Sequence, residues 1–251
     1  MDVPDYIEAC RRDGQLFAAA ISGVSSDTMV PTCPEWTVRD LTIHLGHVHR
    51  WARTYVVSGR PDMLSDAEEA ELFDTPPDSE LVSWFAEGHD ALIAAFEMAP
   101  PDLSCWTFLR APSPLAFWTR RQTHETAIHR VDAESTGTHR SPFSTDVAVD
   151  GIEELLHEFA AGRPRTPDVT APVRLGIHAH DAGRFWLVSI GPDGISVGPG
   201  HERELSDCTV SASAADLYLL LWNRRPLAGL TFAGDAGVVD LWSQTIRVRW
   251  S

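Results

Sequence analysis

The segment VPTCPEWTVRDLTIHLGHVHRWA, residues 30–52, decides how the first half of the chain folds. Its two prolines each remove a backbone donor, so residues 30–36 are expected to be irregular rather than helix or strand. Thr37 and Asp40 have the spacing of a capping box, which marks the start of a helix. After that start, apolar residues recur at helical spacing, at Leu41, Leu45, Val48 and Ala52. The segment therefore predicts a proline loop that leads into a long amphipathic helix.

Three further helices are expected around this one, over residues 5–22, 78–99 and 117–134. The first has apolar residues at near-helical spacing, and a pair of prolines and a Ser-Thr-Gly-Thr run mark the ends of the other two. The acidic run at residues 68–71 is interpreted as a solvated loop. Four helices with fairly long connections are typical of a helix bundle.

The pattern changes in the second half of the chain. One more helix is expected over residues 146–161, and from residue 173 apolar and polar side chains alternate as in a half-buried strand. Turn signals then separate two further strands, 184–190 and 195–197, and a helical pattern returns over residues 212–222. We therefore expect an α+β protein with two domains. Residues 1–143 would form the four-helix bundle, and residues 144–251 a small α+β domain with an antiparallel sheet.

The charge of the chain excludes several classes of partner. The 251 residues include 36 acidic and 20 basic side chains, which gives a net charge of −16 with histidine neutral. Nucleic acids and anionic membrane surfaces both need a positive patch, so neither is expected as a partner. All the basic residues are arginine, which excludes Schiff bases and other lysine-dependent chemistry.

The sequence also favours a cytoplasmic location. The N-terminus is acidic where a signal peptide would be basic and then apolar, and the apolar runs are too short to span a membrane. The cysteines are scattered without paired spacing, at Cys10, Cys33, Cys105 and Cys208. In such a chain they are expected to be reduced. Cys33 has no basic neighbour closer than Arg39, so it is not interpreted as a nucleophile.

The segment HETAIH, residues 124–129, carries the strongest chemical signal. It resembles the zinc-protease motif but is one residue too long, so its two histidines point about 140° apart around a helix. Glu125 and His129, however, are four residues apart and share a helical face, with Asp132 one turn further on. A carboxylate and an imidazole in this arrangement are a common contribution of one bundle helix to a metal site.

A third ligand from another helix would complete such a site. His44, in the middle of the helix that Thr37 begins, is the best candidate, and His47 is the reserve. Asp40, one turn before His44, could accept the other ring proton of that histidine. Two histidines and one glutamate leave a fourth tetrahedral position open, which is the pattern of a catalytic zinc.

Simpler interpretations remain open at this point. A Glu–His pair four residues apart is often an intrahelical salt bridge, and a histidine like His44 is often a core residue. A rival metal pair, His178 and His180 beside Asp181, is better explained as the solvent-facing side of a strand.

Together, residues 30–52 and the segment HETAIHRVDAE (124–134) resemble the mycothiol-dependent maleylpyruvate isomerase family. The pattern PxWxxxDLxxHL and the ExxxH pair recur together in this chain, with the second segment about 70 residues after the first. This resemblance implies a DinB-like four-helix bundle followed by a small α+β domain similar to sterol-carrier proteins. It also implies that zinc is held by His44, Glu125 and His129, and that the thiol mycothiol is the cosubstrate.

The resemblance further implies a reaction: a zinc-bound thiolate would add to the double bond of maleylpyruvate and leave after rotation. Arginines suit such an anionic substrate. The candidates are Arg50, Arg53, Arg120, Arg121, Arg224 and Arg225, and the pair Arg224 and Arg225 could close over the site from the second domain.

Two alternatives stay open. The same site could conjugate mycothiol to another electrophilic small molecule as an S-transferase, or the chain could be a non-catalytic ligand-binding protein with zinc. A monomer or a small homo-oligomer is expected in each case.

Overall fold

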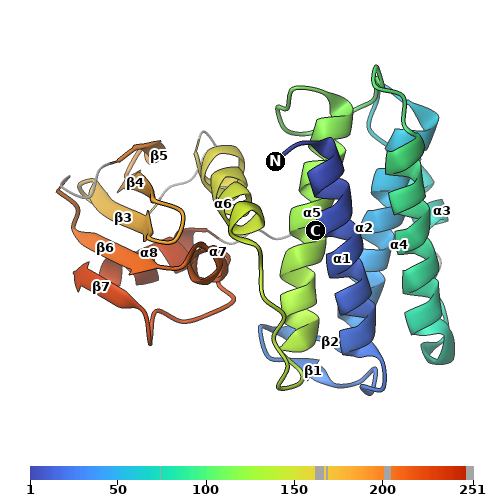
Figure 1. Ribbon diagram of the computed structural model, residues 1–251, viewed down its shortest axis with the longest axis horizontal. Helices are drawn as coiled ribbons and strands as arrows, with labels where there is room; N and C mark the ends of the chain where they lie inside the picture. Colours follow the sequence, from blue (N-terminus) through green and yellow to red (C-terminus); the bar gives the residue numbers. More distant parts are fainter. Residues whose placement is uncertain (74, 162–166, 168, 201–204, 247–251) are drawn as a thin grey trace. The chain divides into compact units, whose positions relative to one another are not determined.

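The computed structural model describes residues 1–73, 75–161, 167, 169–200 and 205–246 (Figure 1). The chain divides into two compact units, Met1–Ser141 and Pro142–Ser251. The first unit is dominated by helices and the second combines helices with a sheet, so the predicted α+β class is confirmed.

Four helices form the bundle of the first unit. They are α1 (Val3–Ile21), α2 (Val38–Ser58), α4 (Leu81–Met98) and α5 (Pro114–Glu134). They run side by side, and each packs against two others: α1 and α2 both contact α4 and α5 (Figure 1). The sequence predicted all four, with ends that differ by a few residues. The single turn η1 (Asp78–Glu80) leads into α4.

The start of α2 is the one that the sequence predicts. The Thr37 side chain accepts a hydrogen bond of 3.2 Å from the backbone N–H of Asp40, and the Asp40 carboxylate accepts one of 2.9 Å from the N–H of Thr37. Both donors would otherwise have no partner within the helix. Gly59 ends α2 in the left-handed conformation with φ of 62°, which glycine adopts at little cost. The capping box therefore fixes where His44 and its neighbours lie along the bundle.

Two expectations for the connections are wrong. Residues 30–36 are not irregular, because β1 (Met29–Val30) and β2 (Cys33–Thr37) pair as an antiparallel ribbon at one end of the bundle (Figure 1). Pro34 is tolerated because each strand of a two-stranded ribbon has an open edge, where a missing N–H costs no ladder bond. Residues 68–71 form part of the short helix α3 (Asp66–Leu72) rather than a loop. Ser65 caps that helix, and acidic side chains in its first turn favour it.

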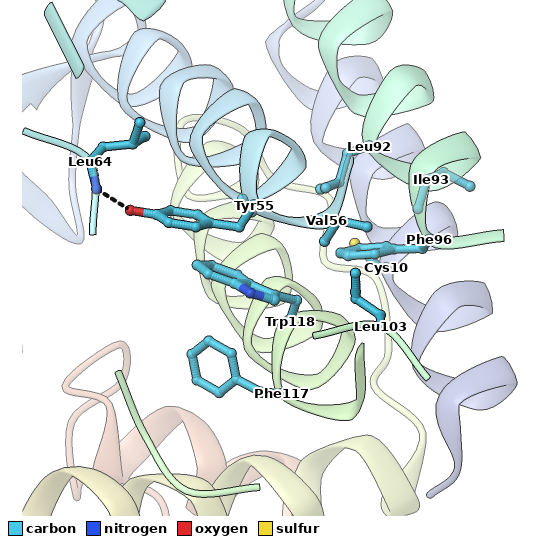
Figure 2. Close-up of a cluster of buried hydrophobic side chains, with 11 residues drawn as sticks. Cys10, Tyr55, Val56, Leu64, Leu92, Ile93, Phe96, Leu103, Phe117 and Trp118 are labelled. Atoms are coloured by element: carbon cyan, nitrogen blue, oxygen red, sulfur yellow. Dashed lines mark hydrogen bonds between the residues drawn. The ribbon is translucent and has the colours of Figure 1, made fainter. Parts of the chain in front are cut away.

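An aromatic cluster fills one part of the bundle core (Figure 2). The rings of Tyr55 from α2 and Trp118 from α5 stack with centroids 5.1 Å apart. The Tyr55 hydroxyl accepts a hydrogen bond of 2.9 Å from the backbone N–H of Leu64, and Trp118 donates one of 3.0 Å to the carbonyl of Trp106. Both buried polar tips are thus satisfied, as the burial of large aromatic residues requires. The cluster ties the loops on either side of α4 to the helices.

The second unit contains a five-stranded sheet with helices. The strands are β3 (Val173–Ala179), β4 (Arg184–Gly191), β5 (Gly194–Pro199), β6 (Cys208–Ala212) and β7 (Thr231–Gly234), in the spatial order β5-β4-β3-β6-β7. The helices are α6 (Thr145–Glu154), continued by the π-helical turn η2 (Leu155–Ala160), then α7 (Ala214–Leu221) and α8 (Gly237–Thr245).

This sheet is mainly antiparallel, as the sequence predicted, with one parallel pair. Strand β6 pairs with β3 in parallel, whereas the other neighbouring strands are antiparallel. The alternation in β3 that the sequence shows is present, with Leu175, Ile177 and Ala179 buried. Such alternation gives the buried face of a strand but not the direction of its partner. Strands β6 and β7 and helix α8 were not predicted from the sequence. No helix in the described part of the chain is both long and apolar enough to cross a membrane.

Buried histidines between the bundle helices generate a prediction about acid stability. His49 is fully buried, with Nε2 2.9 Å from the Thr126 hydroxyl and its ring 5.1 Å from that of His89. Burial, together with the neighbouring His89, lowers the pKa of His49 well below its ordinary value of 6.5. The folded chain therefore keeps His49 neutral, whereas the unfolded chain binds a proton as the pH falls through 6.5.

We expect the free energy of unfolding of the metal-free protein to decrease below pH 6.5, by up to about 1.4 kcal/mol per pH unit from His49. His49→Gln, which keeps an amide near the Thr126 hydroxyl but does not titrate, should reduce that slope. Urea unfolding between pH 5.5 and 7.5 measures it. His180→Gln is the control, since His180 is exposed, and a slope in His49→Gln equal to that of the wild type would contradict the prediction.

Candidate metal centre

The three predicted ligands lie together inside the bundle. His44 comes from α2, whereas Glu125 and His129 come from α5, one helical turn apart. One ligand atom from each lies within 4.8 Å of the others, and this is the one such group of histidine, cysteine and carboxylate side chains among the described residues. Glu125 Oε1 lies 3.3 Å from His44 Nε2 and 3.2 Å from His129 Nε2.

These separations fit the donor set of a zinc site. With zinc–nitrogen and zinc–oxygen bonds near 2.1 Å, the corners of a tetrahedron are about 3.4 Å apart. The two measured separations from Glu125 Oε1, 3.3 and 3.2 Å, are close to that edge length. Two imidazole nitrogens and one carboxylate oxygen are also ligands that zinc prefers. The residues present therefore suit a zinc ion with one open position.

The Glu125 carboxylate is held from two sides. Oε1 faces the two histidines, and Oε2 accepts a hydrogen bond of 2.8 Å from Nη2 of Arg121, one turn earlier on α5. Burial alone would raise the pKa of Glu125. The hydrogen bonds with His129 and His44 and the charge of Arg121 instead hold that pKa well below its ordinary value. The carboxylate is therefore ionised at neutral pH and can serve as a ligand.

His129 is oriented by a second carboxylate. Its Nδ1 lies 2.9 Å from Oδ2 of Asp132, and Oδ1 of Asp132 accepts a hydrogen bond of 2.6 Å from the Thr32 hydroxyl. Burial lowers the pKa of His129, but the hydrogen bonds to Asp132 and Glu125 outweigh it and raise the value to about 9. The Asp132 carboxylate accepts a hydrogen bond from Nδ1–H, so the other ring nitrogen, Nε2, faces His44 and Glu125, as in the carboxylate–histidine pairs of known metal sites.

The structure assigns the orienting role to Asp132 rather than to Asp40. The Asp40 carboxylate is engaged with Thr37 at the start of α2, so the expected contact with His44 is not formed. Asp132 shares a face with His129 because the two are three residues apart, and that spacing was visible in the sequence. Thr32 was missed, because a contact across 100 residues leaves no local signal.

Trp36 is a second feature that the sequence did not reveal. Its ring centroid lies 4.8 Å from that of His44 and 5.9 Å from that of His129. Trp36 belongs to β2, and Thr32 immediately precedes that strand. The ribbon of β1 and β2 thus contacts the cluster twice, through an aromatic ring and through a hydroxyl.

The other histidine candidates have different surroundings. His47 stacks on Phe73 with ring centroids 4.4 Å apart and is not part of the cluster. His178 lies 3.0 Å from the Ser211 hydroxyl, and Asp181 accepts a hydrogen bond from the backbone N–H of Ala214 at the start of α7. His180 is exposed. The interpretation of this pair as part of an ordinary strand therefore remains the better one.

None of the four cysteines is in a disulfide. Cys10 is fully buried, and burial raises the pKa of its thiol to about 12, so Cys10 is not a thiolate at neutral pH. Cys33 is half-buried and packs against one of the core clusters.

The arginines proposed for the substrate have partners of their own. Arg121 is buried against Glu125, and Arg50 lies over the ring of Trp84 at 3.8 Å and donates to that residue's carbonyl. In the second unit Arg225 forms an ion pair with Asp216, and Arg224 donates to the carbonyl of Trp222. The role of Arg224 and Arg225 over the metal site stays a prediction.

Comparisons with known proteins agree with this picture. A family model described as the mycothiol maleylpyruvate isomerase N-terminal domain matches residues 7–134, and the model of the C-terminal domain of the same family matches residues 146–241. No curated protein sequence matches the chain. Two solved structures, a mycothiol-dependent maleylpyruvate isomerase and a histidine-to-alanine variant of it, are similar. Each has 14% sequence identity and a TM-score of 0.64, and the alignment covers 93% of both chains.

The pairing of His129 with Asp132 leads to a prediction for the metal-free protein. Asp132→Asn removes the negative charge beside Nδ1, so the pKa of His129 should decrease from about 9 by about one to two units. NMR titration of the histidine ring signals in the presence of a chelator measures this value. Asp40→Asn is the matched control and should leave it unchanged, because Asp40 caps α2 instead. A pKa near 9 in Asp132→Asn would show that Asp132 does not hold the His129 proton.

Proposed function

The chain belongs to the mycothiol maleylpyruvate isomerase family, and from that membership we propose that it is a zinc- and mycothiol-dependent isomerase. The observation that carries the proposal is the meeting of His44, Glu125 and His129, whose ligand atoms lie within 4.8 Å of one another. A structural zinc has four protein ligands, whereas a catalytic zinc has three and leaves its fourth position to water or substrate. Three protein ligands therefore favour a catalytic site. We further propose that the bundle is DinB-like, that the second unit is similar to sterol-carrier proteins, and that the enzyme acts in the cytoplasm.

Zinc at this position would supply one kind of chemistry: it would bind the sulfur of mycothiol as thiolate at neutral pH. Other residues of the chain orient the proposed ligands. Asp132 keeps Nε2 of His129 directed at the cluster, and Arg121 keeps Glu125 ionised and oriented. Trp36 lies against the rings of both histidines and limits how they can rotate.

The proposed reaction is addition followed by elimination. The thiolate sulfur forms a bond to one carbon of the cis carbon–carbon double bond of maleylpyruvate. The π electron pair of this double bond moves toward the adjacent carbonyl, which gives an enolate. Rotation about the resulting single bond follows. The enolate then reforms the double bond in the trans geometry and expels the thiolate, so fumarylpyruvate is released and mycothiol is regenerated.

The substrate carries two carboxylates, and arginine is the residue that binds carboxylates best through its planar fork. We propose that Arg224 and Arg225, which follow α7 in the chain, fulfil this role. Arg225 would then have to exchange its ion pair with Asp216 for the substrate.

Removal of one ligand tests the site. His129→Ala should lose bound zinc and reduce the mycothiol-dependent isomerisation of maleylpyruvate to the uncatalysed rate, because two ligands hold the ion too weakly. Metal analysis after dialysis and the rate at fixed mycothiol are the measurements. Cys33→Ser is the control and should keep both zinc and activity. An active, metal-free His129→Ala would overturn the site, and an inactive but folded Cys33→Ser would mean that the reactive sulfur belongs to the protein.

The fate of mycothiol distinguishes isomerase from S-transferase. Because elimination returns the thiol, an isomerase should convert many equivalents of maleylpyruvate per mycothiol and leave the free thiol concentration unchanged. Thiol titration alongside product analysis measures both. Consumption of one mycothiol per product with an electrophilic substrate would favour the S-transferase, and calorimetry that shows no mycothiol binding to the zinc-loaded protein would favour a ligand-binding protein. His44→Ala is the control for the binding experiment.

A further inference from the structure

The two oxygens of Glu125 face different partners, and this asymmetry has a consequence for the metal centre. Oε1 is the atom near both histidines, at 3.3 and 3.2 Å from their Nε2 atoms. Oε2 is the atom that accepts the hydrogen bond of 2.8 Å from Arg121. Because Arg121 and Glu125 are four residues apart on α5, the helix itself keeps the guanidinium beside Oε2.

This pair is buried. Arg121 is 2% exposed and Glu125 is 4% exposed. Water therefore screens their interaction poorly, and a charged hydrogen bond of this length is among the stronger ones in proteins. The guanidinium also stays charged under all ordinary conditions. A substrate carboxylate would have to displace Glu125 to reach Arg121, so the geometry argues against the substrate-binding role that the sequence suggested for this arginine.

We propose that Arg121 is a positioning residue of the metal centre, which keeps Oε2 of Glu125 away from the ion. Glu125 would then offer one oxygen, and the coordination position that a second oxygen would fill stays open for the thiol sulfur. This inference rests on the proposed function, because it concerns the same metal centre.

The charge of Arg121 has a second effect. A zinc ion with one carboxylate and one thiolate has no net charge left, and a fixed positive charge behind the carboxylate reduces the repulsion between the two anions. Arg121 should therefore favour the ionised form of the bound thiol. A neutral residue in its place would weaken mycothiol binding most at neutral pH, where the free thiol is protonated.

The experiment compares Arg121→Met with a matched control on the same helix. Arg130 is also buried and pairs with Glu134, four residues later on the helix, at 3.0 Å and with Asp13 of α1 at 3.2 Å. Cobalt(II) replaces zinc, because its visible absorption decreases in intensity when the coordination number rises from four to five. We expect weaker absorption in Arg121→Met, as Glu125 binds through both oxygens, and the wild-type spectrum in Arg130→Met.

Mycothiol affinity for the cobalt-loaded protein gives a second readout. At pH 7 it should be about tenfold weaker in Arg121→Met, the size of a one-unit shift in the acidity of the thiol, and the difference should shrink at pH 9. Arg121→Lys should recover most of the affinity because it restores the charge. Arg121→Gln keeps a donor for Oε2 without the charge, so it should show the wild-type spectrum with the weaker affinity.

The outcomes separate this inference from the proposed function. If the wild-type chain binds no cobalt, the metal centre and the role of Arg121 are both overturned. If the wild type binds cobalt and mycothiol and Arg121→Met has the same spectrum and the same affinity, only the role of Arg121 is overturned. Should Arg121→Met fail to fold, Arg121→Ala replaces it in the cobalt experiment, and a wild-type spectrum in that variant overturns the positioning role. Arg121→Gln tests the charge effect alone, and wild-type mycothiol affinity at pH 7 in that variant overturns that effect.

Discussion

Glu125 places an ionised carboxylate inside the bundle, and much of the surrounding structure follows from what that charge requires. A buried carboxylate without partners would strongly destabilise the folded chain, so the folded state must hold partners in place around Glu125. Two partners, Arg121 and His129, lie one turn away on either side along α5, and the third, His44, comes from α2. Helices α2 and α5 must therefore keep one register. The capping box of α2 and the stacked rings of Tyr55 and Trp118 both serve that register.

The pairing of Glu125 with His129 on one helical face could be predicted from the sequence because it follows helical spacing. On any helix, a carboxylate and a histidine four residues apart share one face. The helix α2, which carries His44, was predictable because a capping box marks its start and its apolar residues recur at helical spacing over 21 residues. Two other residues have local partners in place of the roles that were expected for them. Asp40 has the right spacing to support His44, but its carboxylate accepts a hydrogen bond from Thr37 at the start of the helix. Arg121 has the charge to bind a substrate carboxylate, but it is hydrogen-bonded to Glu125.

The second half of the chain was less predictable for a related reason. Alternation along a strand depends only on which face is buried, so β3 and β4 were found close to their true limits. The parallel pairing of β6 with β3 needs a connection that crosses the sheet, and no local pattern encodes the direction of a crossing. Strand β7 has four residues, all exposed, and a strand without a buried face shows no alternation. Strand β2 was not predicted because it contains Pro34. Proline is excluded only from central strands, and β2 belongs to a two-stranded ribbon.

The ribbon of β1 and β2 lies outside the helices, and its order would be coupled to metal binding at the proposed centre. Thr32 is bonded to the carboxylate that orients His129, and Trp36 lies on the rings of both histidines. An ion that fixes the two histidine rings would favour the ordered state of the ribbon by some factor. Because such coupling is reciprocal, a ribbon held in its ordered state would raise the affinity for the ion by the same factor. Metal binding at the proposed centre and the order of the exposed ribbon would then be linked in one equilibrium. A molecule that binds the ribbon would change the affinity for the metal without contacting the ligands.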